Sequence, residues 1–454
     1  MVRIGALLLA LGLVGGCATV PPAGPSLPPV AQFALPPMRT FGRPEPSPPQ
    51  RSNEEIARDF LDLTFELENG ESLPVFTRFD EPVTIALTGD SRPIFDIELD
   101  RLIDRMRSEA GIDIRRTDDP ATAAIVVEAI SSDDLRHAVP SAACFVLPRR
   151  ITWADFRANM RRKDLDWGSL RKRDAATIFV PADVSPQEVR DCLHEETAQA
   201  LGPVNDLYRL EDSIFNDDNM HSVLTGFDMI VLRAAYDPAL QDGMTRDEVA
   251  ARLPAILARI NPRGERYATR PLSPTPREWK DAIDGALTLD RGIGARRQSS
   301  IQALVIAQDQ GWQDTRLGLS LLTSARLASG QDGAFALEAF LKAREVYDSR
   351  EATRIHAANV GIQIAAFALA AGDFETAIAL ADRYIPVTQK EENAALLADF
   401  LLVRAASEEA LGKTAQAKRD RREGYGWARY GLRSDEAVIR RAAEIEALVP
   451  QGEA

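Results

Sequence analysis

Cysteine and histidine are scarce in this chain of 454 residues, which contains three cysteines and four histidines. Cys144 and Cys192 therefore do not predict a metal site, because no further thiol or imidazole ligands stand near them. Basic residues are also outnumbered, with 54 Lys and Arg against 68 Asp and Glu, for a net charge of −14. Nucleic acid is not an expected partner, since binding to phosphates requires clustered Lys and Arg.

Long apolar runs are absent after the first 16 residues, so the remaining chain predicts no transmembrane helix. The apolar run of residues 4–16 follows Arg3 and is too short to span a bilayer as a helix. A basic start, a short apolar core and the small residues Gly15 and Gly16 are typical of a secretory signal. Residues 1–16 are therefore a predicted signal peptide.

The four residues Val14-Gly15-Gly16-Cys17 resemble a bacterial lipobox. This resemblance implies that Cys17 is the first mature residue and carries a lipid that anchors the chain to a membrane. We expect an outer-membrane anchor in the bacterial cell envelope, with the protein facing the periplasm. The alternative is an ordinary signal peptide whose cysteine is incidental.

Export changes the interpretation of Cys144 and Cys192, the two cysteines that remain. An oxidising compartment favours a disulfide between them, and two free thiols are the alternative.

The length predicts two folded domains. We expect residues 17–52 to form a spacer from the membrane, because eleven of the 28 prolines lie between positions 21 and 49 and favour extended polyproline geometry. Residues 53–262 combine predicted helices at 54–67 and 94–106 with predicted strands at 82–87, 123–130 and 176–180. Strand, helix and strand at this spacing predict a parallel pair with a crossover helix, and hence an α/β (α+β) domain.

Residues 271–454 have no strand pattern and are rich in Ala, Leu, Glu and Arg. Gly330, Gly372 and Gly412 each separate two helical stretches. This weak repeat predicts an all-α domain of tetratricopeptide-like helical hairpins, which usually present a surface to a protein partner. A plain helical bundle without a partner is the alternative.

The segment of residues 185–206 holds the densest set of polar candidates. It predicts a helix that ends at Leu201, before Gly202. His194-Glu195 does not start an H-E-x-x-H zinc motif, because Ala198 stands where the second histidine would fall.

When the motif is started at Glu195 instead of His194, the residues have the spacing of the metzincin pattern H-E-x-x-H-x-x-G-x-x-H. Glu195, Gln199 and Asn205 stand at the three metal-ligand positions, and Glu196 stands at the position of the general base. Thr225 and Asp228 then predict a capping box at the start of a last helix.

Several motifs together carry a family resemblance. They are Asn53-Glu54-Glu55-Ile56-Ala57, Thr77-Arg78-Phe79-Asp80-Glu81-Pro82, Gln199-Ala200-Leu201-Gly202, Ser213-Ile214-Phe215-Asn216-Asp217-Asp218 and Tyr236-Asp237-Pro238. The combination resembles a family of exported bacterial proteins known as domain of unknown function 2927. The resemblance covers about residues 53–260 and implies no established activity.

Oxygen donors dominate the candidate site. Glutamate, glutamine and asparagine do not suit zinc, so no cofactor is expected, and a hard divalent cation such as calcium or magnesium is the alternative. The leading hypothesis is a non-zinc binding or scaffolding protein on a degenerate, metzincin-like fold. The second is a cell-envelope hydrolase of peptide or amide bonds that uses Glu196, with or without such a cation. The third gives Glu195 and Glu196 a purely structural role in the helix.

A basic segment at residues 149–173 contrasts with the acidic chain. Trp153, Phe156 and Met160 recur within it at helical spacing. A solvated face around an apolar stripe is the favoured interpretation, and binding of anionic groups or membrane headgroups is the alternative.

Overall fold

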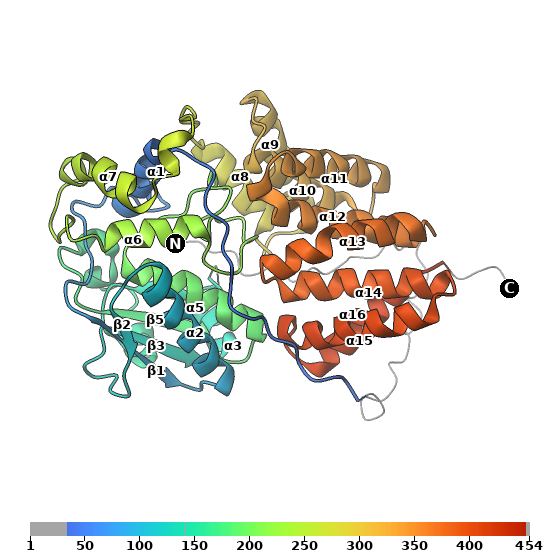
Figure 1. Cartoon of the computed structure of the whole chain (residues 1–454), viewed down its shortest axis with the longest axis horizontal. Coiled ribbons are helices and arrows are strands. Elements are labelled where there is room, and N and C mark those ends of the chain that lie inside the picture. Colours follow the sequence, from blue (N-terminus) through green and yellow to red (C-terminus); the bar gives the residue numbers. More distant parts are fainter. Residues whose placement is uncertain (1–33, 141, 451–454) are drawn as a thin grey trace. The chain divides into compact units, whose positions relative to one another are not determined.

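The computed structural model describes residues 34–140 and 142–450. The predicted signal peptide and Cys17 lie outside these residues. The described chain falls into two compact units, drawn in Figure 1. One unit comprises residues 46–184 and 188–274, and the other comprises residues 34–45, 185–187 and 275–450. The first is a mixed sheet with helices and the second is all-helical, which confirms the predicted order of an α/β part followed by an α part.

A five-stranded sheet with the order β2-β1-β3-β5-β4 forms the centre of the α/β unit. Its strands are β1 (Val83–Gly89), β2 (Ile114–Arg116), β3 (Ile125–Ile130), β4 (Phe145–Leu147) and β5 (Ala176–Pro181). The pairs β1–β2, β1–β3 and β3–β5 are parallel, whereas β4 runs antiparallel to β5. The three predicted strands are confirmed. The two strands that were not predicted contain three residues each, too few to show a periodic pattern.

Helices lie on both faces of this sheet. They are α1 (Asn53–Phe65), α2 (Pro93–Glu109), α3 (Ser132–Ala138), α4 (Trp153–Ala158), α5 (Pro186–Leu201), α6 (Gly226–Ala235) and α7 (Arg246–Ile260). One face packs with α1, α2, α5, α6 and α7 into the main core. The other face packs with α3 and α4. Neighbouring residues of β5 join different cores, Ile178 the main one and Phe179 the smaller one, because strand side chains alternate between faces.

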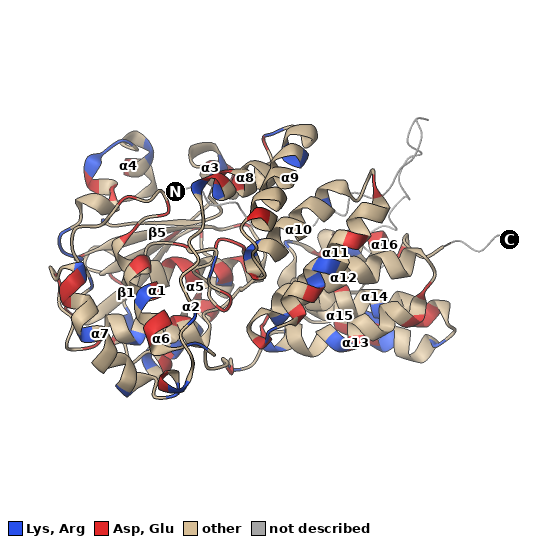
Figure 2. Cartoon of the chain, turned by 90° about the horizontal axis from the view of Figure 1, so that it is seen from above, with Lys and Arg blue, Asp and Glu red and all other residues tan. Residues whose placement is uncertain are grey.

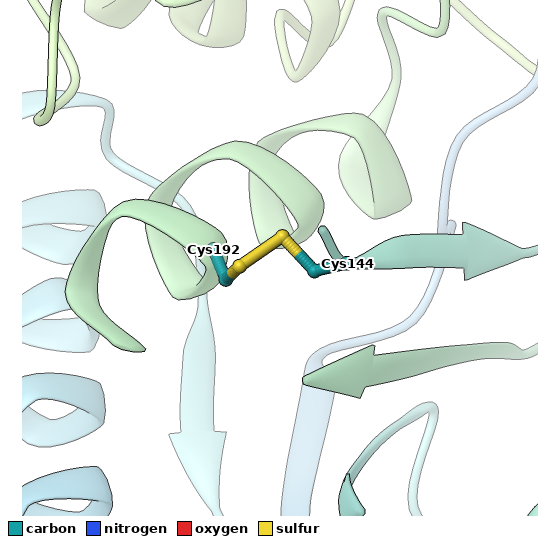
Figure 3. Close-up of a disulfide and its surroundings, with 2 residues drawn as sticks. All are labelled: Cys144 and Cys192. Carbon is teal, nitrogen blue, oxygen red and sulfur yellow. A yellow bond between two sulfur atoms is a disulfide. The ribbon is translucent and has the colours of Figure 1, made fainter. Parts of the chain in front are cut away.

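A disulfide joins the edge of the sheet to α5. Cys144 directly precedes β4, and its sulfur is bonded to that of Cys192 on α5, as Figure 3 shows. The predicted pairing is therefore present. The bond closes a loop with a sequence separation of 48 residues. In the chain-entropy model such a loop stabilises the folded state by about 4 kcal/mol.

The helical unit consists of consecutive antiparallel hairpins. Its helices are α8 (Arg277–Leu287), α9 (Ile293–Asp309), α10 (Thr315–Ala328), α11 (Gly333–Asp348), α12 (Arg354–Ala370), α13 (Phe374–Lys390), α14 (Ala394–Ala410), α15 (Thr414–Gly431) and α16 (Asp435–Glu446). The predicted turns are confirmed, because Gly330, Gly372 and Gly412 each lie between two helices. Gly372 and Gly412 adopt φ of 75° and 73°, a left-handed conformation that favours glycine at a helix end.

A repeated contact supports the hairpin interpretation. A Cβ on Gly318 of α10 would lie 2.4 Å from the ring of Tyr347 on α11. In the next hairpin, a Cβ on Gly361 of α12 would lie 2.3 Å from the ring of Tyr384 on α13. Both hairpins therefore close by packing a tyrosine ring directly on the backbone of the partner helix.

Among the described residues, no helix combines the length and the apolar character needed to cross a bilayer.

Candidate functional site

Helix α5 carries most of the candidate residues, and it is buried. The predicted helix is confirmed, since α5 ends at Leu201. Glu196 is fully buried with 0% of its surface exposed, and His194 and Gln199 are also buried. Glu195 is partly exposed. Polar side chains that are removed from water in this way need hydrogen-bond partners inside the protein.

The chain after α5 is buried without regular structure. Residues 202–225, all of which the structure describes, contain no helix or strand, and most of them are buried. Backbone N–H and C=O groups in such a segment lack the partners that a helix or a sheet supplies. Polar side chains around the segment supply several of those partners.

His194 supplies one of these partners. Its Nδ1 accepts a hydrogen bond of 3.0 Å from the backbone N–H of Leu224. Burial lowers the pKa of His194 well below its ordinary value, and the nearby charges of Arg105 and Arg190 lower it further. The imidazole is therefore neutral, and it fixes the end of the irregular segment to α5.

Two of the three predicted ligand positions also hold this segment. The Nδ2 of Asn205 donates to the carbonyl of Asp62 on α1 at 3.0 Å, and its Oδ1 accepts from the N–H of Asp206 at 3.0 Å. The Nε2 of Gln199 donates to Oδ2 of Asp206 at 3.3 Å. The structure thus brings Gln199 next to the Asn205-Asp206 pair, and it uses both amides in hydrogen bonds within the protein.

Glu195 and Glu196 lie beside the disulfide. Among the described residues, the possible ligand atoms of Glu195, Glu196 and Cys144 lie within 4.8 Å of one another. The sulfur of Cys144 is bonded to Cys192 and is therefore no thiolate ligand. Two carboxylates remain, of which one is buried. Calcium usually takes six to eight oxygen ligands and magnesium six, so this pair alone does not make a complete cation site.

The last carbonyls of α5 are capped by two side chains from other elements. The buried guanidinium of Arg173 donates to the carbonyls of Gln199 (3.2 Å), Ala200 (2.7 Å) and Gly202 (3.2 Å). The hydroxyl of Tyr236 donates to the carbonyl of Leu201 at 3.1 Å. Burial raises the pKa of Tyr236, so this hydroxyl stays protonated. A cation at this end also complements the helix dipole.

Arg173 differs from its predicted setting. The sequence grouped it with the basic segment of residues 149–173, but it is buried and its guanidinium lies over the ring of Trp167 at 4.7 Å. The predicted apolar stripe is also shorter than expected. Trp153 and Phe156 pack into the smaller core, whereas Met160 lies beyond the end of α4 and is 45% exposed. Figure 2 shows the Lys and Arg residues of this region on and around α4.

Asp228 organises the turn that precedes α6. Its carboxylate accepts hydrogen bonds from the Ser213 hydroxyl (2.6 Å) and from the N–H groups of Ile214 (3.1 Å) and Thr225 (2.7 Å). The predicted capping box of Thr225 and Asp228 is confirmed. The same carboxylate therefore starts α6 and fixes the turn at residues 213–216.

Ion pairs with α1 hold the outer part of the irregular segment, and no local pattern in the sequence predicts them. Arg209 binds Asp59 and Asp62 of α1, both at 2.7 Å. Arg51 binds the same Asp59 at 3.1 Å. The ring of His221 contacts the carbonyl of Glu211, in the same segment, at 3.3 Å.

The fold and the site define an α/β domain with a buried polar core between α5 and the segment that follows it, joined in sequence to a helical unit. Residues 53–255 match the model of the family described as "Protein of unknown function (DUF2927)". The match over these residues confirms the resemblance predicted from the sequence. A search of curated proteins and a search of solved structures gave no match.

The burial of neutral His194 predicts a pH-dependent stability. Because its pKa is lowered in the folded state, the unfolded chain binds the additional proton as the pH falls below about 6.5, the ordinary value for histidine. The free energy of unfolding should therefore fall with decreasing pH in that range, by up to about 1.4 kcal/mol per pH unit from this residue. Urea unfolding at pH 7.5, 6.5 and 5.5 measures the slope.

His194→Gln should remove this part of the slope, whereas His137→Gln, at an exposed position, should leave it unchanged. Equal slopes in the wild type and His194→Gln would show that the imidazole is not held neutral.

Proposed function

We propose that this chain is a cell-envelope protein anchored by a lipid on Cys17 and that it binds or scaffolds other molecules without zinc chemistry. In this proposal the α/β domain is a degenerate, metzincin-like fold, and the helical unit is a tetratricopeptide-like docking surface for a protein partner. An outer-membrane anchor would place both on the periplasmic side.

One observation argues against zinc chemistry at these positions. The side chains at two of the three ligand positions, Gln199 and Asn205, are hydrogen-bonded to Asp206 and to the backbone of residues 62 and 206. His194, the one imidazole on α5, accepts from a backbone N–H. A zinc ion would have to displace these bonds, and it would gain only amide and carboxylate oxygens in return.

The disulfide supports export. A bond between Cys144 and Cys192 persists in an oxidising compartment such as the periplasm and is rare in the cytosol.

The helical unit supports a docking role. Two of its hairpins repeat the same tyrosine-on-glycine contact, and stacked helical hairpins form extended surfaces that bind other proteins.

A hydrolase is the second candidate because of Glu196. Its carboxylate is fully buried and lies next to that of Glu195. A buried carboxylate next to a partly exposed one is an arrangement that can serve general acid or base catalysis.

Substitution of Glu196 tests the two candidates against each other. We expect that the purified protein does not hydrolyse muropeptides or casein-derived peptides above background, and that Glu196→Gln gives the same result as the wild type. Mass spectrometry of the products measures turnover. Glu195→Gln is the matched control, because it changes the neighbouring, partly exposed carboxylate. Turnover by the wild type that falls at least a hundredfold in Glu196→Gln alone would establish the hydrolase instead.

The anchor has a separate test. Cys17→Ser should move the protein from the membrane fraction to the soluble periplasmic fraction and should abolish incorporation of labelled fatty acid. Cys144→Ser with Cys192→Ser is the control, which should still be labelled and stay with the membrane. Fatty-acid labelling that persists in Cys17→Ser would refute anchoring at this residue.

A further inference from the structure

The later part of the predicted spacer, residues 34–45, belongs to the helical unit. It contains no helix or strand and runs along α15. Two hydrogen bonds fix its backbone to that helix. The N–H of Arg39 donates to the carbonyl of Gly426 at 2.9 Å, and Arg429 donates to the carbonyl of Pro36 at 2.9 Å. We call residues 34–45 the strap.

Aromatic rings bury the far end of the strap. Phe41 is only 8% exposed, although it lies in a segment whose other side chains are mostly open to solvent. Its ring centroid lies 4.4 Å from that of Trp427 and 5.9 Å from that of Tyr430, the second in an edge-on arrangement. At the other end, Leu35 joins a small apolar cluster with residues of α14, α15 and α16.

The middle of the strap depends on a glycine and a charge on α15. A Cβ on Gly426 would lie 2.9 Å from Cγ of Arg39 and 3.3 Å from the carbonyl oxygen of Pro37, so a larger residue would push the strap away. The guanidinium of Arg39 pairs with Glu423, with a distance of 3.1 Å between Nε and Oε2. On α15 the extended peptide thus contacts the carbonyl of Gly426, the carboxylate of Glu423 and the aromatic rings of Trp427 and Tyr430. It also packs on the helix backbone at Gly426, where no side chain stands in the way.

These are the features by which proteins recognise proline-rich peptides, whose extended backbone leaves its carbonyls free for donors and whose side chains fit between aromatic rings. We propose that α15 carries a binding site for an extended proline-rich peptide with a basic and an aromatic side chain, and that the strap of this chain is its resident ligand.

Occupation of this site shortens the membrane tether, a consequence that rests on the proposed lipid at Cys17. In polyproline geometry, the twelve residues of the strap would span about 37 Å if they were released. Docked residues contribute none of this length. A proline-rich segment of another envelope protein that replaced the strap would therefore lengthen the reach of the domains from the membrane.

Amide hydrogen exchange of the full chain tests the docking directly. The amide of Arg39 should exchange at least tenfold more slowly in the native wild type than in a free synthetic peptide of residues 34–45, because this N–H is bonded to α15. Phe41→Ala should remove most of this protection. Met38→Ala is the matched control, because Met38 lies in the same strap but is 39% exposed, and it should exchange like the wild type.

Charge reversal at the pair of Arg39 and Glu423 gives a second, independent test of the docking. Glu423→Arg should speed exchange of the strap, and Arg39→Glu in the same chain should restore the protection.

The synthetic peptide of residues 34–45, labelled with a fluorophore, should bind the Phe41→Ala chain and should bind the wild type at least tenfold more weakly.

Exchange of the wild-type strap at the rate of the free peptide, or a peptide that binds neither chain at millimolar concentration, would overturn the proposal. Neither result concerns the lipid, so failure of the strap and failure of the anchor are distinguishable.

Discussion

The α/β domain depends on one constraint, the burial of residues 202–225 without a helix or a strand. Every backbone polar group in such a segment must find a partner that is not supplied by a regular ladder. Several of these partners come from α5, from α1 and from Asp228. His194 binds one end of the segment, Asn205 the other, and Asp228 the turn between them. Positions that could coordinate a metal in another protein are therefore needed here to fold the chain.

This constraint decides the chemistry of the site. Asn205, whose donor and acceptor are both bonded within the buried network, would lose those bonds if it turned towards an ion. Each buried group left unpaired costs about 1–3 kcal/mol. The disulfide also disfavours metal binding. Cys144 lies beside the carboxylates of Glu195 and Glu196, but its sulfur is bonded to Cys192 and offers no thiolate ligand. What remains is a polar core that positions backbone, together with two adjacent carboxylates of which one is buried.

Local signals in the sequence predicted the parts of the fold that have local causes. The strands at residues 83–89, 125–130 and 176–181, the end of α5 before Gly202 and the capping box of Thr225 and Asp228 all follow from spacing and capping rules. Arg173 was misplaced among surface charges, because its partners on α5 are separated from it by more than 25 residues. The ion pairs of Arg209 with α1 span about 150 residues, and no pattern along the chain marks them. The strap shows the same limit, since its proline content predicted the extended backbone but not its docking on a helix nearly 400 residues away.

We infer that Gln199 and Asn205 are structural amides that do not ligate a transition metal. The most direct measurement is the zinc content of the full chain, purified without chelator and then equilibrated with zinc at micromolar concentration, for the wild type and for the variant Gln199→Ala with Asn205→Ala. We expect less than about 0.1 zinc per chain in the wild type and a lower unfolding free energy in the variant, by about 1–3 kcal/mol for each lost amide. One zinc per chain in the wild type that is lost in the variant would show instead that these two amides ligate the metal.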